Sequence, residues 1–322
     1  MTAATFHAGE RAVQQRVGVA ERMAQVGPRV IRDFMPDQHR ELFEKLPFML
    51  MGALDVQGRP WATMLAGAPG FVHTPDAQTL DIDAMPLGLS QIPLALAAGD
   101  SLGLLGIEPA TRRRNRVNGE LLSVGAGGLH IGVLQSFGNC PKYINAHTPH
   151  HVEPTPGAAK AFGALLPSPA RSLVQAADTF FIATASADAA EAHRAANGGV
   201  DVSHRGGKPG FVHVDEQHGA HVLTVPDFIG NFFFNTLGNI TVHPRAGLLF
   251  ADWTTGDLLM LTAQAEIIWN GPAVEGFAGA QRLLRLTVTE GRWLPGAMPL
   301  RAGEAEPAPQ LQATGDWPSA AA

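Results

Sequence analysis

The pentapeptide PGFVH occurs twice in this chain, at residues 69–73 and again at 209–213. The two occurrences lie 140 residues apart, and a proline follows each at the same offset, at Pro86 and Pro226. Five identical residues in register are not expected by chance in a chain of 322 residues. The chain therefore contains an internal repeat.

The similarity extends on both sides of the pentapeptide. Upstream, PDQHRELFEKL and FMLMGALD in the first copy match PARSLVQAADT and FFIATASAD in the second. Downstream, GLL recurs at 103–105 and 247–249, and VNGELLSV matches LTAQAEII. Each copy is predicted to be a helix followed by about six strands, so the chain resembles a fused dimer.

The repeated segments are typical of antiparallel β-structure. Short apolar runs such as WATMLAG, GFVHTPD and TLDIDAM are separated by Gly, Pro and Asp, which favour tight turns between strands. A sheet of this size has exposed edges, and closure into a small barrel removes them. The sequence therefore predicts a mainly β fold: two tandem β-barrels with flanking helices, packed as a pseudo-dimer.

Five segments follow from this division. We expect an N-terminal helical segment at 1–35, a first barrel at 36–145, a Pro-rich linker at 146–167, a second barrel at 168–300 and a flexible tail at 301–322. Pro36 and Asp37 open a short helix, and Ser168 before Pro169 is expected to cap a helix that continues through Ala177. The tail is expected to be disordered because of its composition.

Composition narrows the class of protein. A mass of 34 kDa and a hydrophobic content of 45% allow a substantial core, and a single cysteine excludes an intrachain disulfide. No apolar run approaches the length of a membrane span, so we expect no membrane association and a cytoplasmic location. The net charge of −6 argues against nucleic-acid binding, and RRRNR at 112–116 is expected to be a solvated strand edge.

The two copies differ in polarity where a ligand could bind. At the offset of 140, Ser203, His204, Arg205 and Gly206 of the second copy stand opposite Thr63, Met64, Leu65 and Ala66 of the first. Further along, the second copy carries Asn231, Asn235, Thr236 and Asn239 where the first is mostly apolar. In a pseudo-dimer one site can persist while its equivalent decays, so the second copy is expected to hold the ligand.

These residue types suit a phosphorylated heterocycle. Ser203, Arg205 and Lys208, next to the glycines of SHRGGKPG, supply the charge-assisted donors and the close main-chain approach that phosphate needs. Asparagine carboxamides can pair with the edge of a planar heterocycle. A polar hairpin turn would explain SHRGGKPG alone, but it would not explain the accompanying asparagines.

The segment QSFGNCPKYIN, at 135–145, ends the last strand of the first copy and can reach the pocket of the second. It would add Gln135, Ser136, Asn139 and Lys142. Cys140 is expected to be a packed or ligand-adjacent thiol, because no histidine is placed beside it to activate it. Tyr143 is either a core aromatic residue or a lid over the ligand.

The remaining candidates have plainer interpretations. Two groups of histidines, His147, His150 and His151 and then His213, His218 and His221, lack regular zinc-ligand spacing with cysteine, so no metal site is predicted. Trp253 is expected to be an ordinary packed tryptophan.

Taken together, four segments resemble the flavin-binding relatives of pyridoxamine 5′-phosphate oxidase, in the double-length subgroup with two split barrels. They are FHAGERAVQQRVGV, QSFGNCPKYI, DVSHRGGKPGFV and GNFFFNTLGNITVHPRAGLLF, and the resemblance covers nearly all of residues 5–300. It implies two tandem FMN-binding split barrels, with FMN at their interface. Carried over by position, the FMN ligands would be Ser203, Arg205, Lys208, Asn231, Asn235, Thr236 and Asn239, with Gln135, Ser136 and Asn139 from the other barrel.

The resemblance implies an FMN-dependent oxidoreductase that acts on a small-molecule substrate or electron donor, and a homodimer is compatible with it. No residue is assigned as general acid or base. The alternative is a flavin- or haem-binding module without turnover that serves as a sensor or carrier.

Overall fold

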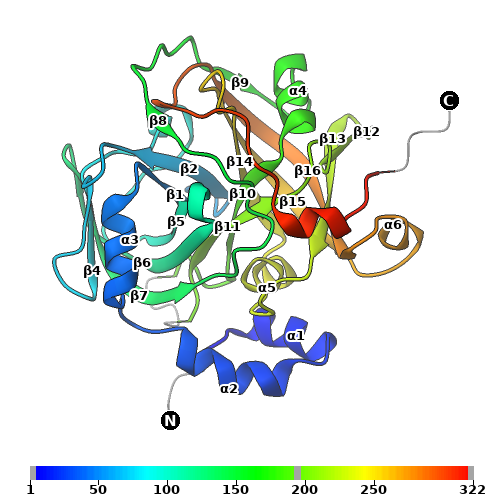
Figure 1. Cartoon of the computed structure of the whole chain (residues 1–322), viewed down its shortest axis with the longest axis horizontal. Helices are drawn as coiled ribbons and strands as arrows, with labels where there is room; N and C mark the ends of the chain where they lie inside the picture. Colours follow the sequence, from blue (N-terminus) through cyan, green and yellow to red (C-terminus); the bar gives the residue numbers. More distant parts are fainter. Residues whose placement is uncertain (1–4, 192–196, 318–322) are drawn as a thin grey trace.

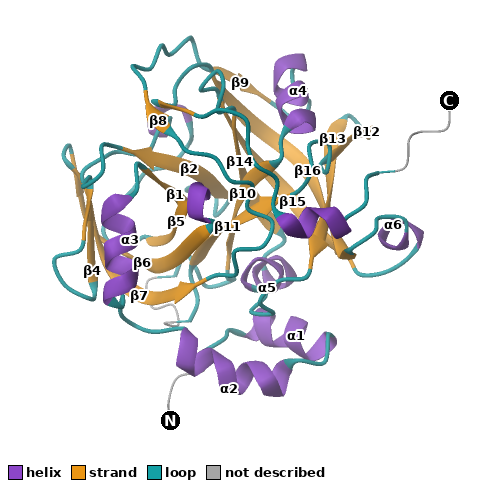
Figure 2. Ribbon diagram, viewed as in Figure 1, coloured by secondary structure: helices purple, strands orange, loops and turns teal. Residues whose placement is uncertain are grey.

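The computed structural model describes residues 5–191 and 197–317. Its helices are α1 (Ala8–Arg16), α2 (Ala20–Val30), α3 (Asp37–Lys45), α4 (Ser168–Ala176), α5 (Asn235–Val242) and α6 (Pro272–Glu275), with short 3-10 helices η1 (Leu89–Gln91), η2 (Pro109–Thr111) and η3 (Pro309–Ala313). Figure 1 shows α1 and α2 together beneath α5, and Figure 2 shows that strands make up most of the body of the molecule.

Strands form two large antiparallel sheets. The first contains β1 (Phe48–Leu54), β2 (Pro60–Ala66), β3 (Val72–His73), β4 (Thr79–Ile82), β5 (Ser101–Glu108), β6 (Arg113–Gly125) and β7 (Gly128–Gly138). The second contains β10 (Thr179–Ala185), β11 (Val200–Gly206), β12 (His213–Gln217), β13 (Ala220–Phe228), β14 (Arg245–Ala251), β15 (Leu258–Ile268) and β16 (Ala280–Leu294). We call them the first barrel and the second barrel.

The two barrels have the same strand order. It is β2-β1-β5-β6-β7-β4-β3 in the first and β11-β10-β14-β15-β16-β13-β12 in the second, element for element. PGFVH follows β2 and ends in β3 in the first barrel, and it follows β11 and ends at the first residue of β12 in the second. The predicted mainly β class and the two tandem split barrels of a pseudo-dimer are confirmed.

The barrels pack through equivalent pairs of strands: β2 contacts β14, and β5 contacts β11. The glycines of the two GLL segments make this contact possible. A Cβ on Gly103 would lie 2.6 Å from the carbonyl oxygen of Val200, and one on Gly247 would lie 2.5 Å from that of Pro60. Pro60 and Val200 are the first residues of β2 and β11, so the two close approaches are related by the pseudo-symmetry.

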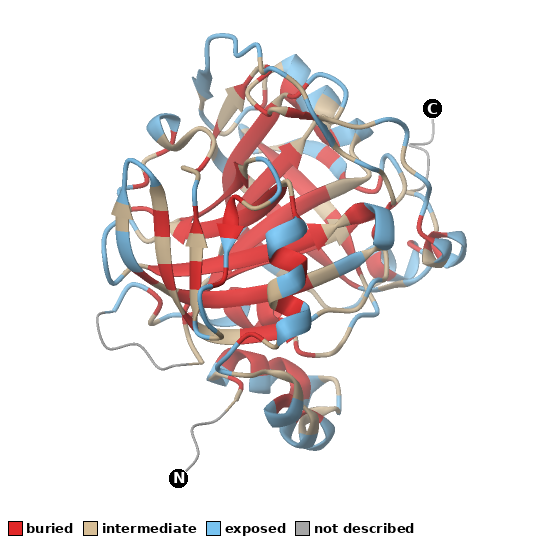
Figure 3. Cartoon of the chain, turned by 60° about the vertical axis from the view of Figure 1, so that its left-hand side comes forward, coloured by how far each residue is buried: buried red, intermediate tan, exposed pale blue. Residues whose placement is uncertain are grey.

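Burial is concentrated in these strands, which are red through the middle of Figure 3. The largest apolar cluster crosses the interface: Leu249, Leu258, Met260 and Leu294 of the second barrel pack with the core of the first. A separate cluster fills the second barrel and includes Phe180, Phe250 and Leu286. The two barrels therefore share apolar packing as well as a backbone contact.

The predicted helices at the N-terminus are present, and α3 begins directly after Pro36. The expected cap at Ser168 is wrong, since α4 begins at Ser168 itself, after Pro167, with no side-chain cap. Among the described residues, no helix has both the length and the apolar character needed to cross a membrane.

The expectation of a flexible tail at 301–322 is wrong for the residues described. After β17 (Leu300–Arg301), which pairs with β8 (His150–His151), the chain continues to η3, where Leu311 is buried. Trp317 then donates from Nε1 to the carbonyl oxygen of Phe211 at 2.8 Å. Contacts of a few apolar residues therefore order this segment, although its Pro- and Ala-rich composition is typical of disorder. Residues 318–322 lie outside the described range.

Part of the linker at 146–167 also forms strands that pair with the rest of the chain. Its β9 (Lys160–Phe162) pairs with β16, and its β8 pairs with β17. Short pairings of this kind fix the path of a segment whose composition alone suggests a loop.

We predict that Gly103→Ala lowers the free energy of unfolding by about 1–3 kcal/mol, because the new methyl group meets backbone of β11 that cannot rotate away. Denaturant unfolding would measure it. Gly125→Ala is the matched control, since nothing lies within 4 Å of its Cβ position. Equal stability of the two variants would contradict the close approach.

Candidate functional site

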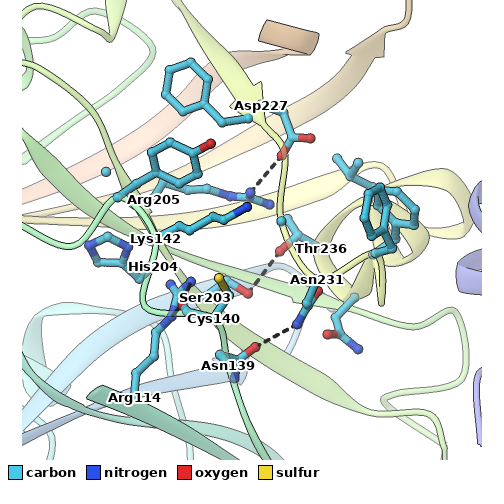
Figure 4. Close-up of a pocket in the computed structure, with 18 of the residues that line it drawn as sticks. Arg114, Asn139, Cys140, Lys142, Ser203, His204, Arg205, Asp227, Asn231 and Thr236 are labelled. Carbon is cyan, nitrogen blue, oxygen red and sulfur yellow. Dashed lines mark hydrogen bonds and ion pairs between the residues drawn. The ribbon is translucent and has the colours of Figure 1, made fainter. Parts of the chain in front are cut away.

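A pocket lies where the two barrels meet at the N-terminal end of α5. The second barrel contributes the end of β11, the end of β13 and the segment leading into α5, and the first contributes β6 and the residues after β7. Figure 4 shows side chains from both barrels converging on this space. The site is therefore built from segments far apart in sequence.

Many of the residues singled out in the sequence lie together in this pocket. They are Asn139, Lys142, Ser203, His204, Arg205, Asn231, Asn235 and Thr236. The hydroxyl groups of Thr236 and Ser203 are hydrogen-bonded at 3.1 Å. Asn231 donates from Nδ2 to Oδ1 of Asn139 at 3.3 Å, which joins the wall formed by one barrel to that formed by the other.

Four predicted residues do not line the pocket. Gln135 and Ser136 are still within β7, where Gln135 accepts from Asn118 at 3.2 Å and the Ser136 hydroxyl pairs with His39 at 2.8 Å. The chain turns toward the pocket only after Gly138. Lys208 and Asn239 are engaged elsewhere.

Lys208 and Asn239 have partners that the sequence did not suggest. Lys208 donates from Nζ to the carbonyl oxygen of Thr314 at 2.8 Å, so it anchors the C-terminal segment. Asn239 is buried behind the pocket, where it donates to Thr184 and to Asp201, each at 3.1 Å. Asn239 therefore supports the pocket from behind, whereas Lys208 holds the C-terminal segment.

Two arginines of the RRRNR run line the pocket, so the expectation of a solvated strand edge is wrong for them. Arg116 is 3% exposed and donates from Nη1 to Oδ1 of Asp201 at 2.9 Å, with a further bond to Ser203. Arg114 donates from Nη2 to the carbonyl oxygen of Cys140 at 2.7 Å. Because β6 is covered by the second barrel, charges at this end of the strand are enclosed.

The comparison of the two copies could have found these arginines. In the first barrel Leu105 pairs with Arg116, and in the second its equivalent Leu249 pairs with Met260. By the same register Arg114 is equivalent to Leu258. The polar and apolar difference that singled out Arg205 therefore also holds for β6 and β15.

Positive charge is concentrated in the pocket. Burial, followed by the neighbouring guanidinium groups of Arg116 and Arg205, lowers the pKa of Arg114 to about 9. Burial also lowers the pKa of Arg116, although Asp201 opposes that shift. Neighbouring guanidinium groups contribute to both shifts after burial, so the arginines of the pocket repel one another, while Asp201 and Glu10 oppose the shift at Arg116. A bound anion would relieve the repulsion.

Two buried carboxylates offset part of this charge. Asp201 pairs with Arg116, and Asp227 lies 2.8 Å from Arg205 and 3.6 Å from Arg282. Three buried donor atoms at the pocket still have no partner among the described residues: Nε of Arg116, Nε of Arg205 and Nδ2 of Asn139. All three are nitrogen donors, so the site is short of acceptors.

Aromatic residues form the rest of the wall. Tyr143, with φ of 64°, packs against Phe228 with ring centroids 4.9 Å apart. Phe232 and Phe234, on the approach to α5, also have positive φ values of 66° and 63°. Left-handed backbone is costly for bulky residues and is found at sites where the surroundings enforce it. Of the two alternatives for Tyr143, the structure places it on the pocket wall.

The equivalent place in the first barrel is filled with apolar side chains. Met64 and Leu65, the counterparts of His204 and Arg205, are fully buried in the same cluster as Leu258 and Met260. A Cβ on Gly88 in the adjoining loop would lie 2.4 Å from the Leu294 side chain. Of these two equivalent places, one is therefore a polar pocket and the other is packed with apolar side chains.

The histidines of the two groups lie outside this pocket. His150 and His151 are exposed on β8, and His221 accepts from the backbone amide of Leu166 at 2.7 Å. Across residues 5–191 and 197–317, no three His, Cys, Asp or Glu side chains gather as a metal site would require. Trp253 packs against Phe48 and His147, with ring centroids 5.4 and 4.6 Å away.

No protein-family model and no curated protein matches this chain. Solved structures that align with part of it include HupZ of Group A Streptococcus, with 13% identity and a TM-score of 0.31 over 43% of this chain and 100% of that one. HutZ, a heme storage protein from Vibrio cholerae, aligns with 14% identity and a TM-score of 0.26 over 40% and 93%. A FAD-binding protein from Mesorhizobium loti aligns with 10% identity and a TM-score of 0.26 over 42% and 97%. At these TM-scores none of the likenesses establishes a family or a ligand.

We predict that His204 makes the protein sensitive to acid. Burial, with the nearby charges of Arg114 and Arg205, holds its pKa well below the ordinary 6.5, so the folded chain keeps this imidazole neutral. As the pH falls below 6.5 the unfolded chain takes up the proton first, and the free energy of unfolding falls by up to about 1.4 kcal/mol per pH unit.

His204→Met, which installs the residue found at the equivalent position 64, should flatten this part of the pH profile. Denaturant unfolding between pH 7 and pH 5 is the measurement, with His150→Met as the control at an exposed histidine. An unchanged slope in His204→Met would show that His204 is not the group responsible.

Proposed function

We propose that the pocket binds FMN and that the protein is an FMN-dependent oxidoreductase. The main support for this proposal is that buried nitrogen donors in the pocket lack acceptors and lie beside guanidinium groups that repel one another. Aromatic side chains form the adjacent wall. A phosphate group supplies the missing acceptors and negative charge, and a planar ring suits the aromatic side.

The residues present fit the phosphate of FMN. Arg116 and Arg205 each have an unpartnered Nε, and the hydrogen-bonded hydroxyl groups of Ser203 and Thr236 line the same pocket at the start of α5. Hydroxyl, guanidinium and helix N-terminal donors together are a common combination for phosphate recognition. We assign these four residues to the phosphate.

Asn139, Asn231 and Asn235 would contact the polar edge of the ring system, because carboxamides offer both donors and acceptors. Bound FMN would supply the electron transfer. The protein would orient it, exclude water with Tyr143 and Phe228, and set the charge around it with Lys142 and Arg114. The substrate would enter from the open side of the same pocket.

A haem-binding module without turnover is the second candidate, and His204 favours it. Its imidazole is buried in the pocket and its pKa is lowered, so it is in the neutral form that ligates iron. The guanidinium groups could then pair with carboxylates of the porphyrin. The absorption spectrum distinguishes the candidates, since haem gives a Soret band and FMN gives flavin bands.

We predict that the purified chain binds one FMN per chain and that Arg205→Leu weakens this binding about 10- to 100-fold. The substituted residue is the one at the equivalent position 65, and charge-assisted hydrogen bonds are worth roughly 1.5–3 kcal/mol. Arg282 still faces Asp227 in this variant, so the chain should fold. Fluorescence titration with FMN gives both affinity and stoichiometry.

Arg171→Leu, on the exposed side of α4, is the matched loss of one positive charge and should leave FMN affinity unchanged. Two FMN molecules per chain would contradict the packed counterpart site. Equal weakening by both substitutions would mean that general charge, and not Arg205, holds the ligand.

We further predict that a nicotinamide cofactor reduces the bound flavin faster than it reduces free FMN. Stopped-flow absorbance under anaerobic conditions would follow the loss of the oxidised flavin band. If no donor accelerates reduction over free FMN, the oxidoreductase proposal fails and a flavin carrier remains.

A further inference from the structure

The N-terminal helices lie directly behind the wall of the pocket. Figure 1 shows α1 against α5, and the contact is unusually close, because a Cβ on Gly9 would lie 2.2 Å from the carbonyl oxygen of Gly238. Gly238 is in the middle of α5, whose first residues Asn235 and Thr236 line the pocket. The backbone of α1 therefore fixes where α5 can lie.

Glu10 connects α1 to the pocket through a buried hydrogen bond. Glu10 is 3% exposed, and its Oε1 accepts from Nδ2 of Asn235. Its other oxygen accepts from the backbone amide of His7 at 2.9 Å and completes the cap of α1. One carboxyl group thus holds both the start of α1 and the first residue of α5.

A second bond holds the segment that leads into α5. Gln14 is 1% exposed and donates from Nε2 to the carbonyl oxygen of Phe233 at 3.2 Å. Phe233 lies between Phe232 and Phe234, the two residues with left-handed backbone, and it packs against Phe6 with ring centroids 5.6 Å apart. The N-terminal segment therefore holds the strained backbone in place.

We propose that α1 belongs to the ligand site. Glu10 is a positioning residue, which holds the side chain of Asn235 in the orientation that contacts the bound ligand. The inference rests on the proposed FMN site. It implies that ligand binding and docking of the N-terminal helices favour each other, because affinity for one is linked to formation of the other.

The charges around Glu10 give this coupling a pH dependence. Burial, followed by the nearby carboxylate of Asp201, raises the pKa of Glu10 well above its ordinary 4.5, whereas His7, Asn235 and Arg116 oppose the shift. A raised pKa stabilises the docked state at low pH, and that contribution is lost as the pH rises through the folded value. Docking, and with it ligand affinity, should weaken as the pH rises above 4.5, where the undocked carboxyl ionises before the docked one.

The experiment compares Glu10→Ala and Glu10→Gln with Gln15→Ala, a control at an exposed position of the same helix. FMN affinity is measured by titration at several pH values, and exposure of α1 and α2 by tryptic cleavage at the exposed residues Arg11, Arg16 and Arg22. Local opening of the helices controls such cleavage. Thermal unfolding of each variant serves as the check on folding.

We expect Glu10→Ala to weaken FMN binding about tenfold, the effect of one lost buried hydrogen bond, and to speed cleavage. Glu10→Gln keeps an acceptor for the His7 amide, and its Nε2 can donate to Oδ1 of Asn235 once that carboxamide turns over. It should therefore restore most of the affinity, and because the substituted group does not ionise it should remove the decline with rising pH. FMN should slow cleavage of the unsubstituted chain. Gln15→Ala should change none of these.

The outcomes separate this inference from the proposed function. If FMN binds and Glu10→Ala binds it as tightly as the unsubstituted chain, the positioning role is wrong and the FMN site stands. If FMN does not bind, the same titrations with inorganic phosphate decide: weaker phosphate binding in Glu10→Ala supports the positioning role without FMN. If the chain binds neither probe, both proposals fall.

Discussion

The buried ion pair between Arg116 and Asp201 is the interaction on which the arrangement of the site depends. It joins β6 of the first barrel to β11 of the second, and both side chains are almost fully enclosed. A buried charge is tolerated only when it is paired and hydrogen-bonded. Asp201 meets this condition with additional donors from Asn118 and Asn239, at 2.7 and 3.1 Å. The relative position of the barrels at the pocket is therefore set by electrostatics, whereas elsewhere it is set by apolar packing and by the two glycine contacts.

The two barrels show how one fold serves two purposes. At equivalent positions of the strands, one side of the interface has Arg116 and Arg205, and the other has Met260 and Leu65. The first set encloses a polar pocket, and the second set fills the same space with side chains. Because the two barrels have the same strand order, backbone topology does not determine whether this space is a pocket or is packed. A few side chains on β2, β6, β11 and β15 do.

Much of the fold could be predicted because the repeat is legible in the sequence. PGFVH and GLL fall at equivalent places of two sheets with the same order, and the alternation of apolar runs with turns marks antiparallel strands. The same comparison brought out Ser203, His204 and Arg205, which lie together in the pocket. The internal repeat and the alternation of apolar runs with turns were sufficient for these conclusions.

The parts that were missed depend on long-range packing. Arg114 and Arg116 look like charges on an edge until the second barrel covers β6, and only their comparison with Leu258 and Met260 of the other copy would have marked them. In the sequence Lys208 resembles a phosphate ligand, but in the structure its ammonium group donates to the carbonyl oxygen of Thr314 in the C-terminal segment. That segment has a composition typical of disorder, and its order depends on anchors such as Leu311 and Trp317. No local pattern reveals which distant segment will meet a given side chain.

Fusion of the two barrels into one chain has a consequence for how the site responds to concentration. Sites formed between separate subunits are lost on dilution, because their walls part when the dimer dissociates. Here the residues after β7 and the end of β11 are held to each other within one polypeptide. The pocket should remain whole in a solution so dilute that each molecule is alone, and its occupancy should depend on the amount of ligand but not on the amount of protein.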